Sequence, residues 1–223
     1  MTGLAASGDK PRGRSVLLFG PSDGMIEALD RCLRERGHTV TKAAGDPGAA
    51  LADVPDVVVF AAPDVDERGV FAEDAVLRER TLDAIDTGVN GFLRDAQAFA
   101  KAMLARGGQI WALGLDDSFG YYLDIPVAPM VTSARISFLR AMAKEYGRFG
   151  IAFNAAIVQP TPDVVGEAVF KGRSGALKSY ALKYRPGNAG AFATVLASLI
   201  ENPALPVNGA TLHLGAGVNE HNF

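Results

Sequence analysis

The chain has 223 residues and a formal net charge of −3, from 22 basic and 25 acidic side chains. The basic residues are spread along the sequence, which argues against a nucleic-acid partner, since such proteins gather positive charge on one face. No segment supplies the roughly 20 apolar residues of a membrane span. We therefore expect a cytoplasmic protein whose partners are small molecules or other proteins.

The terminal segment and the reactive side chains add little chemistry. Residues 1–14 are rich in Gly, Ser, Ala and charge, and predict a flexible tail before a single domain over 15–223. Cys32 is the only cysteine, so it cannot form a disulfide within the chain, as suits a reducing compartment. The three histidines lack the short paired spacing of metal ligands, and no metal site is expected.

Short apolar runs alternate with helical patterns along the chain. The run at 56–60 is apolar almost throughout, which is typical of a strand buried on both faces of a parallel sheet. The pattern predicts strands at 15–19, 38–42, 56–60, 109–113, 151–158 and 210–214. It predicts one helix that ends at 37, a short helix that begins at 46, and three more helices at 85–104, about 131–147 and 190–201. Strands separated by helices predict an α/β fold, a three-layer, doubly wound parallel sheet of the Rossmann-like type.

Several segments from Ser15 to Gly217 resemble the short-chain dehydrogenase/reductase family, in the order and spacing of that family. They are GGQIWALG (107–114), Val89-Asn90-Gly91, AMAKEYG (141–147), GIAFNA (150–155), Arg185-Pro186-Gly187 and VNGATLHLGAG (207–217). The resemblance implies an NAD(P)-dependent oxidoreductase of a carbonyl/alcohol pair, in which a tyrosine transfers the proton with help from a lysine and a serine.

The residues of this chain depart from that catalytic set. Alignment on AMAKEYG places Leu115, Ala128 and Thr132 at the serine, tyrosine and lysine positions, and the chain has no Tyr-x-x-x-Lys. Asn90 matches the family's helix asparagine, but without the lysine it is better explained as a polar residue satisfied locally. The chain resembles a degenerate member of the family.

The dinucleotide fingerprint is also reduced. Gly20 and Gly24 match its first two glycines, which allow the tight turn and the close approach of backbone to pyrophosphate, whereas Ile26 replaces the third. Asp23 adds a negative charge beside the pyrophosphate position, unless it caps the helix instead. We expect NAD(P) to bind weakly or not at all.

Two further positions bear on the cofactor. Ala61 is what remains of the family's Asn-Asn-Ala-Gly segment. Lys42, at the end of the second strand, suits the 2′-phosphate of NADP, or is a solvated charge at a strand end. The fourteen residues between Lys42 and Val57 hold only one crossover helix, where the family has helix, strand and helix. One βα unit is predicted to be shortened or missing, at the edge that would hold adenosine.

Three functions are consistent with these features. The first is a non-catalytic subunit of an oligomeric dehydrogenase, in a homo-oligomer or a hetero-oligomer with an active paralogue, joined through the two long helices. The second is an active, atypical NAD(P)-dependent oxidoreductase in which Tyr121 or Tyr122 is the acid, Arg135 replaces the lysine and Ser118 is a further donor. The third is a ligand-binding module or non-redox enzyme that uses the crevice at the carboxyl ends of the strands.

Overall fold

The computed structural model describes residues 13–117, 125–171, 187–202 and 206–215. The strands are β1 (Ser15–Phe19), β2 (Thr39–Ala43), β3 (Val57–Phe60), β4 (Gly108–Leu115), β5 (Ile151–Val158) and β6 (Thr211–Leu214). They form one parallel sheet in the order β2-β1-β3-β4-β5-β6. The predicted α/β doubly wound, Rossmann-like fold is confirmed.

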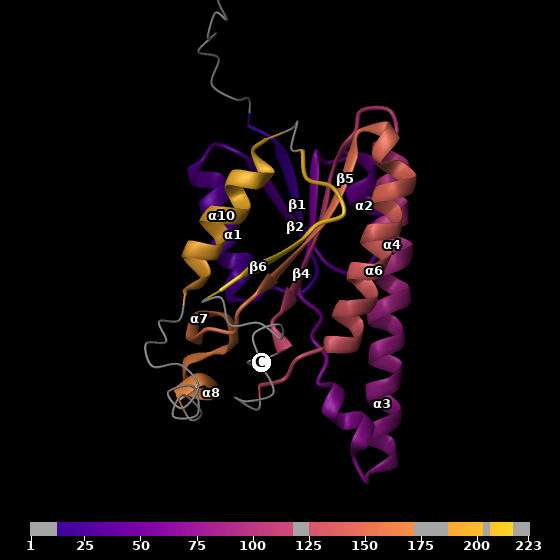
Figure 1. The fold of residues 1–223 in the computed structure, drawn as a ribbon, viewed down its shortest axis with the longest axis vertical. Coiled ribbons are helices and arrows are strands. Elements are labelled where there is room, and N and C mark those ends of the chain that lie inside the picture. Colours follow the sequence, from indigo (N-terminus) through magenta and orange to yellow (C-terminus); the bar gives the residue numbers. More distant parts are fainter. Residues whose placement is uncertain (1–12, 118–124, 172–186, 203–205, 216–223) are drawn as a thin grey trace, which may run out of the picture.

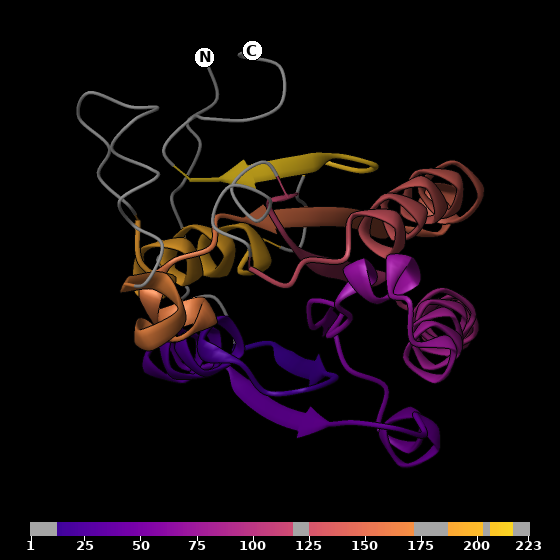
Figure 2. The same ribbon diagram turned by 90° about the horizontal axis from the view of Figure 1, so that it is seen from below.

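Helices cover both faces of the sheet (Figures 1 and 2). On one face lie α1 (Gly24–Glu35) and α10 (Ala189–Ile200), with the short helices α7 (Pro162–Val165) and α8 (Glu167–Lys171) below them. On the other lie α2 (Gly48–Ala52), α4 (Phe92–Met103) and α6 (Pro129–Tyr146), the last followed by the 3₁₀ turn η3 (Gly147–Phe149). Only α2 connects β2 to β3, so β2 forms the edge of the described sheet, as the short interval predicts.

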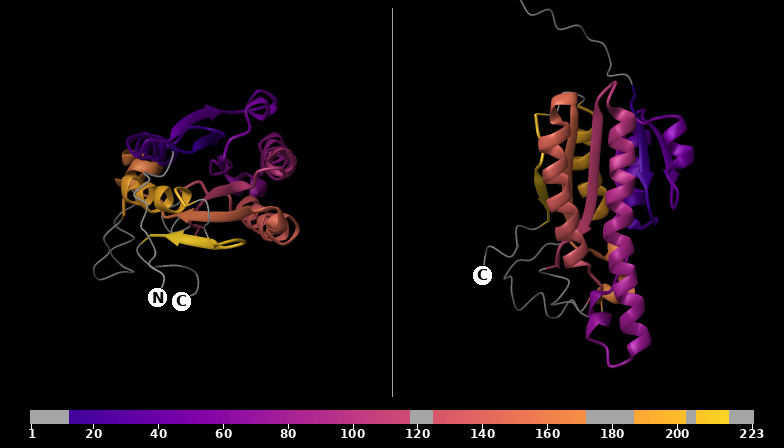
Figure 3. Two further views of the ribbon diagram at one scale, coloured as in Figure 1. Left: turned by 90° about the horizontal axis from the view of Figure 1, so that it is seen from above. Right: turned by 90° about the vertical axis from the view of Figure 1, so that its right-hand side faces the viewer.

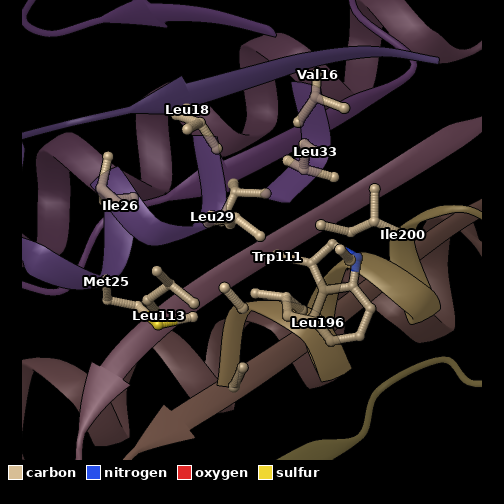
Figure 4. Close-up of a cluster of buried hydrophobic side chains, with 14 of the residues drawn as sticks. Val16, Leu18, Met25, Ile26, Leu29, Leu33, Trp111, Leu113, Leu196 and Ile200 are labelled. Carbon is tan, nitrogen blue, oxygen red and sulfur yellow. The ribbon is translucent and has the colours of Figure 1, made fainter. Parts of the chain in front are cut away.

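Each face of the sheet has its own hydrophobic core. The α1 and α10 side packs aliphatic side chains around Trp111, which is fully buried (Figure 4). Ile26, which replaces the third fingerprint glycine, is 2% exposed and packs within this core. The other side is aromatic: Phe60 contacts Phe92 edge-to-face with ring centroids 4.9 Å apart. These two cores fix the positions of the strand ends.

The first long helix differs from its prediction. It begins at 75 rather than near 85, because the carboxylate of Asp74 accepts hydrogen bonds from the amides of Val76 and Leu77. It runs as α3 (Ala75–Asp86), a π-helical turn η2 (Thr87–Gly91) and then α4, and α3 projects beyond the carboxyl edge of the sheet (Figure 3, right). Leu104, predicted on the buried stripe, is 40% exposed because it lies past the last turn of α4.

Candidate functional site

The carboxyl ends of the strands form the edge where open α/β sheets bind ligands. Gly20 follows β1 there, and its φ of +122° is a conformation that favours glycine. A Cβ on Gly20 would lie 2.9 Å from the Cβ of Ala61, which follows β3 and is buried. The glycine therefore allows the ends of β1 and β3 to pack together, and Ala61 serves that packing.

Gly24, the first residue of α1, provides a close backbone approach, but not to open space. A Cβ at this position would lie 1.7 Å from the carbonyl oxygen of Asp163 in α7. In this structure the close approach at Gly24 is made by the chain's own α7.

Carboxylates of the chain cap the helices that begin at this edge. Asp23 accepts from the Ile26 amide at 2.8 Å, at the N-terminus of α1. Asp163 accepts from the amide of Ala189 at 2.7 Å, at the start of α10. Helix N-termini are where nucleotide phosphates bind, because their free amides and dipole attract anions. At the N-termini of α1 and α10 the place of such an anion is taken by carboxylates of the chain itself.

The N-terminus of α6 is capped from a distant segment. Glu67 lies in the 3₁₀ turn η1 (Glu67–Phe71), and its two carboxylate oxygens accept from the amides of Met130 and Val131, each at 3.1 Å. Glu67 is only 6% exposed. Its carboxylate therefore joins the segment after β3 to the helix on which the family carries its tyrosine and lysine.

Asp23 gives a pH-dependent prediction. Burial raises the pKa of its carboxyl above the usual 3.8, against the hydrogen bonds from Ile26 and Met25 that lower it. The folded state then holds the proton at pH values where the unfolded state has released it, so this group stabilises the fold less as the pH rises through that range. Asp23→Asn keeps the cap without the charge. We expect its stability relative to wild type to increase as the pH rises above the ordinary carboxyl pKa of 3.8, measured by urea unfolding.

Asp23→Ala is the matched control for this prediction. It removes the charge and the cap together, and is expected to lower the free energy of unfolding by about 1 kcal/mol relative to Asp23→Asn at every pH. Equal stabilities of the two variants, or a wild-type difference that does not change with pH, would contradict the assignment.

Lys42 is held in ion pairs, which bears on its two interpretations as a phosphate ligand or as a charge at a strand end. Its Nζ lies 2.8 Å from both carboxylate oxygens of Glu27 and 3.3 Å from Asp30, both on α1. The hydrogen bond to Glu27 is the main cause that raises the pKa of Lys42. Because two carboxylates already neutralise this ammonium, the alternative of a charge held at a strand end describes it better.

The three positions aligned with the family's catalytic set carry no proton-transfer group of that kind. Leu115 ends β4, and Ala128 is buried just before α6. Thr132 lies over Gly114, where an added Cβ would be 2.7 Å from the threonine methyl. Tyr121, Tyr122 and Ser118, the predicted relocated donors, lie outside the described residues.

Arg135 and Asn90 are both engaged within the fold. The Arg135 guanidinium donates to the carbonyl of Gly88 at 3.2 Å and to that of Ala61 at 3.0 Å, and stacks over Phe92, 4.8 Å from the ring centroid. Burial lowers its pKa to about 10. Asn90 is exposed in η2 and donates to Asp86 at 2.6 Å, so it is satisfied one turn back on its own helix.

A cavity of about 480 Å³ lies between α6 and the strands β5 and β6. Its lining is Leu115, Asp116, Asp117, Pro129, Thr132, Ser133, Ile136, Ser137, Arg140, Ile157, Thr211 and His213. None of Gly20, Gly24, Lys42 or Ala61 borders it. Sequence reasoning missed it. The polar residues at intervals of three and four on the cavity side of α6, and at alternate positions of β6, are a signal that could have found it.

Neither a metal cluster nor a membrane helix occurs in the described ranges. No group of three or more His, Cys, Asp or Glu side chains there is arranged to hold a metal ion. No helix in the same part of the chain is long and apolar enough to cross a membrane.

Comparison with known proteins identifies the fold through structure alone. No protein-family model matches the sequence, and no curated protein matches it. A mutant form of a Serratia marcescens short-chain dehydrogenase/reductase superposes with a TM-score of 0.65 at 19% identity, covering 92% of this chain and 97% of that one.

Two other solved structures are similar to the same extent. One is described as ribose-5-phosphate isomerase from Brucella melitensis 16M, with a TM-score of 0.70, 18% identity and coverage of 92% of this chain and 91% of that one. The other is described as a dehalogenation enzyme, with a TM-score of 0.71, 19% identity and coverage of 91% and 96%. These likenesses show a fold like that of the short-chain dehydrogenases/reductases, and their three different descriptions assign no activity to this chain.

Proposed function

We propose that this protein is a non-catalytic subunit of an oligomeric dehydrogenase. It would associate through the two long helices, in a homo-oligomer or in a hetero-oligomer with an active paralogue. The observation that carries the proposal is the set of internal carboxylates, Asp23, Glu67 and Asp163, on the helix N-termini at the carboxyl edge. A dinucleotide phosphate brought to α1 would meet Asp23 and the backbone of α7 rather than free amides. We place the protein in the cytoplasm, as its single cysteine suggests.

The projecting arm formed by η1 and α3 supports the oligomeric part of the proposal. Only Thr81 of α3 is buried, while apolar side chains on the arm face solvent. These are Phe71 at 86% exposure, Val76 at 65%, Leu77 at 46% and Leu82 at 50%. We infer that these exposed apolar side chains contribute to an interaction surface.

The charges of α3 fit a second copy of the same helix. Arg78 and Arg80 lie on either side of Glu79 in its first half, which carries a net positive charge, and Asp83 and Asp86 lie in its second half. A two-fold axis makes the same patch meet itself, so antiparallel α3 helices would set the arginines of one copy against the aspartates of the other. The occupant we propose for the arm is therefore a chain of the same fold, in the first place a second copy.

Two measurements on the full chain test the proposal. Calorimetric titration with NAD(H) and NADP(H) is expected to show no saturable binding. Light scattering after size exclusion is expected to show a dimer or larger, which Leu77→Glu with Leu82→Glu converts to monomer because two buried carboxylates would oppose the interface.

Val195→Glu is the matched control, since Val195 is a similarly exposed apolar residue, 47% accessible, on α10 of the other face. It is expected to leave the mass unchanged. Micromolar cofactor binding would overturn the proposal. So would a monomer that also fails to associate with an active dehydrogenase subunit when the two are co-expressed.

A further inference from the structure

Arg140 sets the chemistry of one end of the cavity between α6 and β6. Its Nη2 lies 3.3 Å from the hydroxyl of Thr211, across the cavity from the helix to the strand. In the part of the chain that the structure describes, Arg140 has no carboxylate partner, whereas Arg34 and Arg36 pair with carboxylates at 2.6 and 3.1 Å. A guanidinium carries five N–H donors, so most of those on Arg140 stay available to a ligand.

The walls beside Arg140 are rich in donors and carry no carboxylate. Ser133 and Ser137 lie one turn apart on the same side of α6. Thr211 and His213 alternate along β6 and so point to the same side of the strand, toward the helix. Hydroxyls, an imidazole and a guanidinium around one space suit an oxyanion, which accepts hydrogen bonds and is attracted by the positive charge.

The other end of the cavity has a different character. Asp116 and Asp117 follow β4 there, beside the apolar side chains of Leu115 and Pro129. Carboxylates accept hydrogen bonds, so they suit the hydroxyl groups of a ligand. From Pro129 to Arg140 the helix rises about 16 Å, enough for a small molecule to extend from one end to the other.

We propose that this cavity binds a small hydroxylated organic anion, a phosphomonoester or a carboxylate, with the anionic group on Arg140 and the hydroxyls toward Asp117. A volume of about 480 Å³ suits such a ligand. The site goes beyond the proposed subunit function and does not depend on it, because its lining is separate from the α3 arm and from the capped end of α1. The two proposals can therefore fail independently.

Calorimetric titration of the full chain tests the site with four probes: glycerol 3-phosphate, glycerate, inorganic phosphate and, as the neutral comparison, glycerol. Saturable binding is expected for glycerol 3-phosphate or glycerate. Which of these two probes binds shows whether the site takes a phosphomonoester or a carboxylate. Inorganic phosphate is expected to bind more weakly, since it lacks the hydroxylated portion, and glycerol not at all. Arg140→Gln should weaken binding at least tenfold through the lost charge-assisted contact.

Arg31→Gln is the matched control, an exposed arginine on α1 across the sheet, and should bind as wild type does. Ser137→Glu is a second variant that keeps Arg140 but adds a carboxylate, and should abolish binding by repulsion. Ser137 and Arg140 are both exposed, so circular dichroism should show an unchanged fold for Ser137→Glu and Arg140→Gln. Three results would overturn the proposal: no saturable binding of any anion at about 10 mM, equal binding of glycerol, or anion binding that survives both Arg140→Gln and Ser137→Glu.

Discussion

Gly24→Ala is expected to destabilise the protein by about 3 kcal/mol or more, one of the largest effects of any single substitution here. The added methyl would lie 1.7 Å from the Asp163 carbonyl oxygen and 2.8 Å from its carbon, and backbone atoms cannot rotate away. The helix α7 would have to move. Because the Asp163 carboxylate also accepts from the Ala189 amide, that movement would remove a cap from α10 as well.

The measurement is the free energy of unfolding in urea, with Gly91→Ala as the matched control. Gly91 has helical angles, φ −60° and ψ −50°, and nothing lies within 4 Å of the place where its Cβ would be. Alanine there is expected to be neutral or to stabilise by up to about 1 kcal/mol. Similar values for the two variants would show that α7 does not pack on α1 as described.

The second large effect is expected at Arg135. Arg135→Met keeps the apolar stem but leaves the Ala61 and Gly88 carbonyls without their donor. Unsatisfied buried carbonyls cost about 1–3 kcal/mol each, and the stacking over Phe92 is lost too. Removal of a charge whose burial is unfavourable, as the lowered pKa indicates, offsets part of this cost. We expect a net loss of about 2–3 kcal/mol in urea unfolding.

Arg135→Lys separates geometry from charge in this prediction. A lysine keeps the positive charge, but its compact ammonium lacks the planar fork that spans the two carbonyls. It is expected to recover less than half of the lost stability. Full recovery would show that the charge, rather than the bridge between the end of β3 and η2, is what the fold requires.

Much of the fold could be predicted from periodicity, because the strands are nearly continuous apolar runs. The interval between Lys42 and Val57 predicted the truncated edge correctly, since a chain of that length has room for one crossover only. The start of α3 was missed because its exposed residues show no apolar stripe. Its beginning depends on the cap from Asp74, a local signal that outweighs periodicity.

The candidate site was harder to predict, because its contacts join residues far apart in the sequence. Gly24 matches a fingerprint glycine in the sequence, but no local pattern shows that the Asp163 carbonyl lies against it. Glu67 on the amides of α6 is a long-range cap of the same kind. The cavity around Arg140 is likewise formed by side chains from β4, α6, β5 and β6, which no local pattern brings together.

The packing of α1 against α10 has a consequence for how this face of the chain folds during synthesis. Leu29 and Leu33 of α1 share their core with Leu196 and Ile200 of α10, and the Arg14 guanidinium donates to the Ile200 carbonyl (Figure 4). This half of the core stays uncovered until residues 189–200 have left the ribosome, more than 150 residues after α1. Until then the nascent chain presents the apolar face of α1 and the sheet to chaperones.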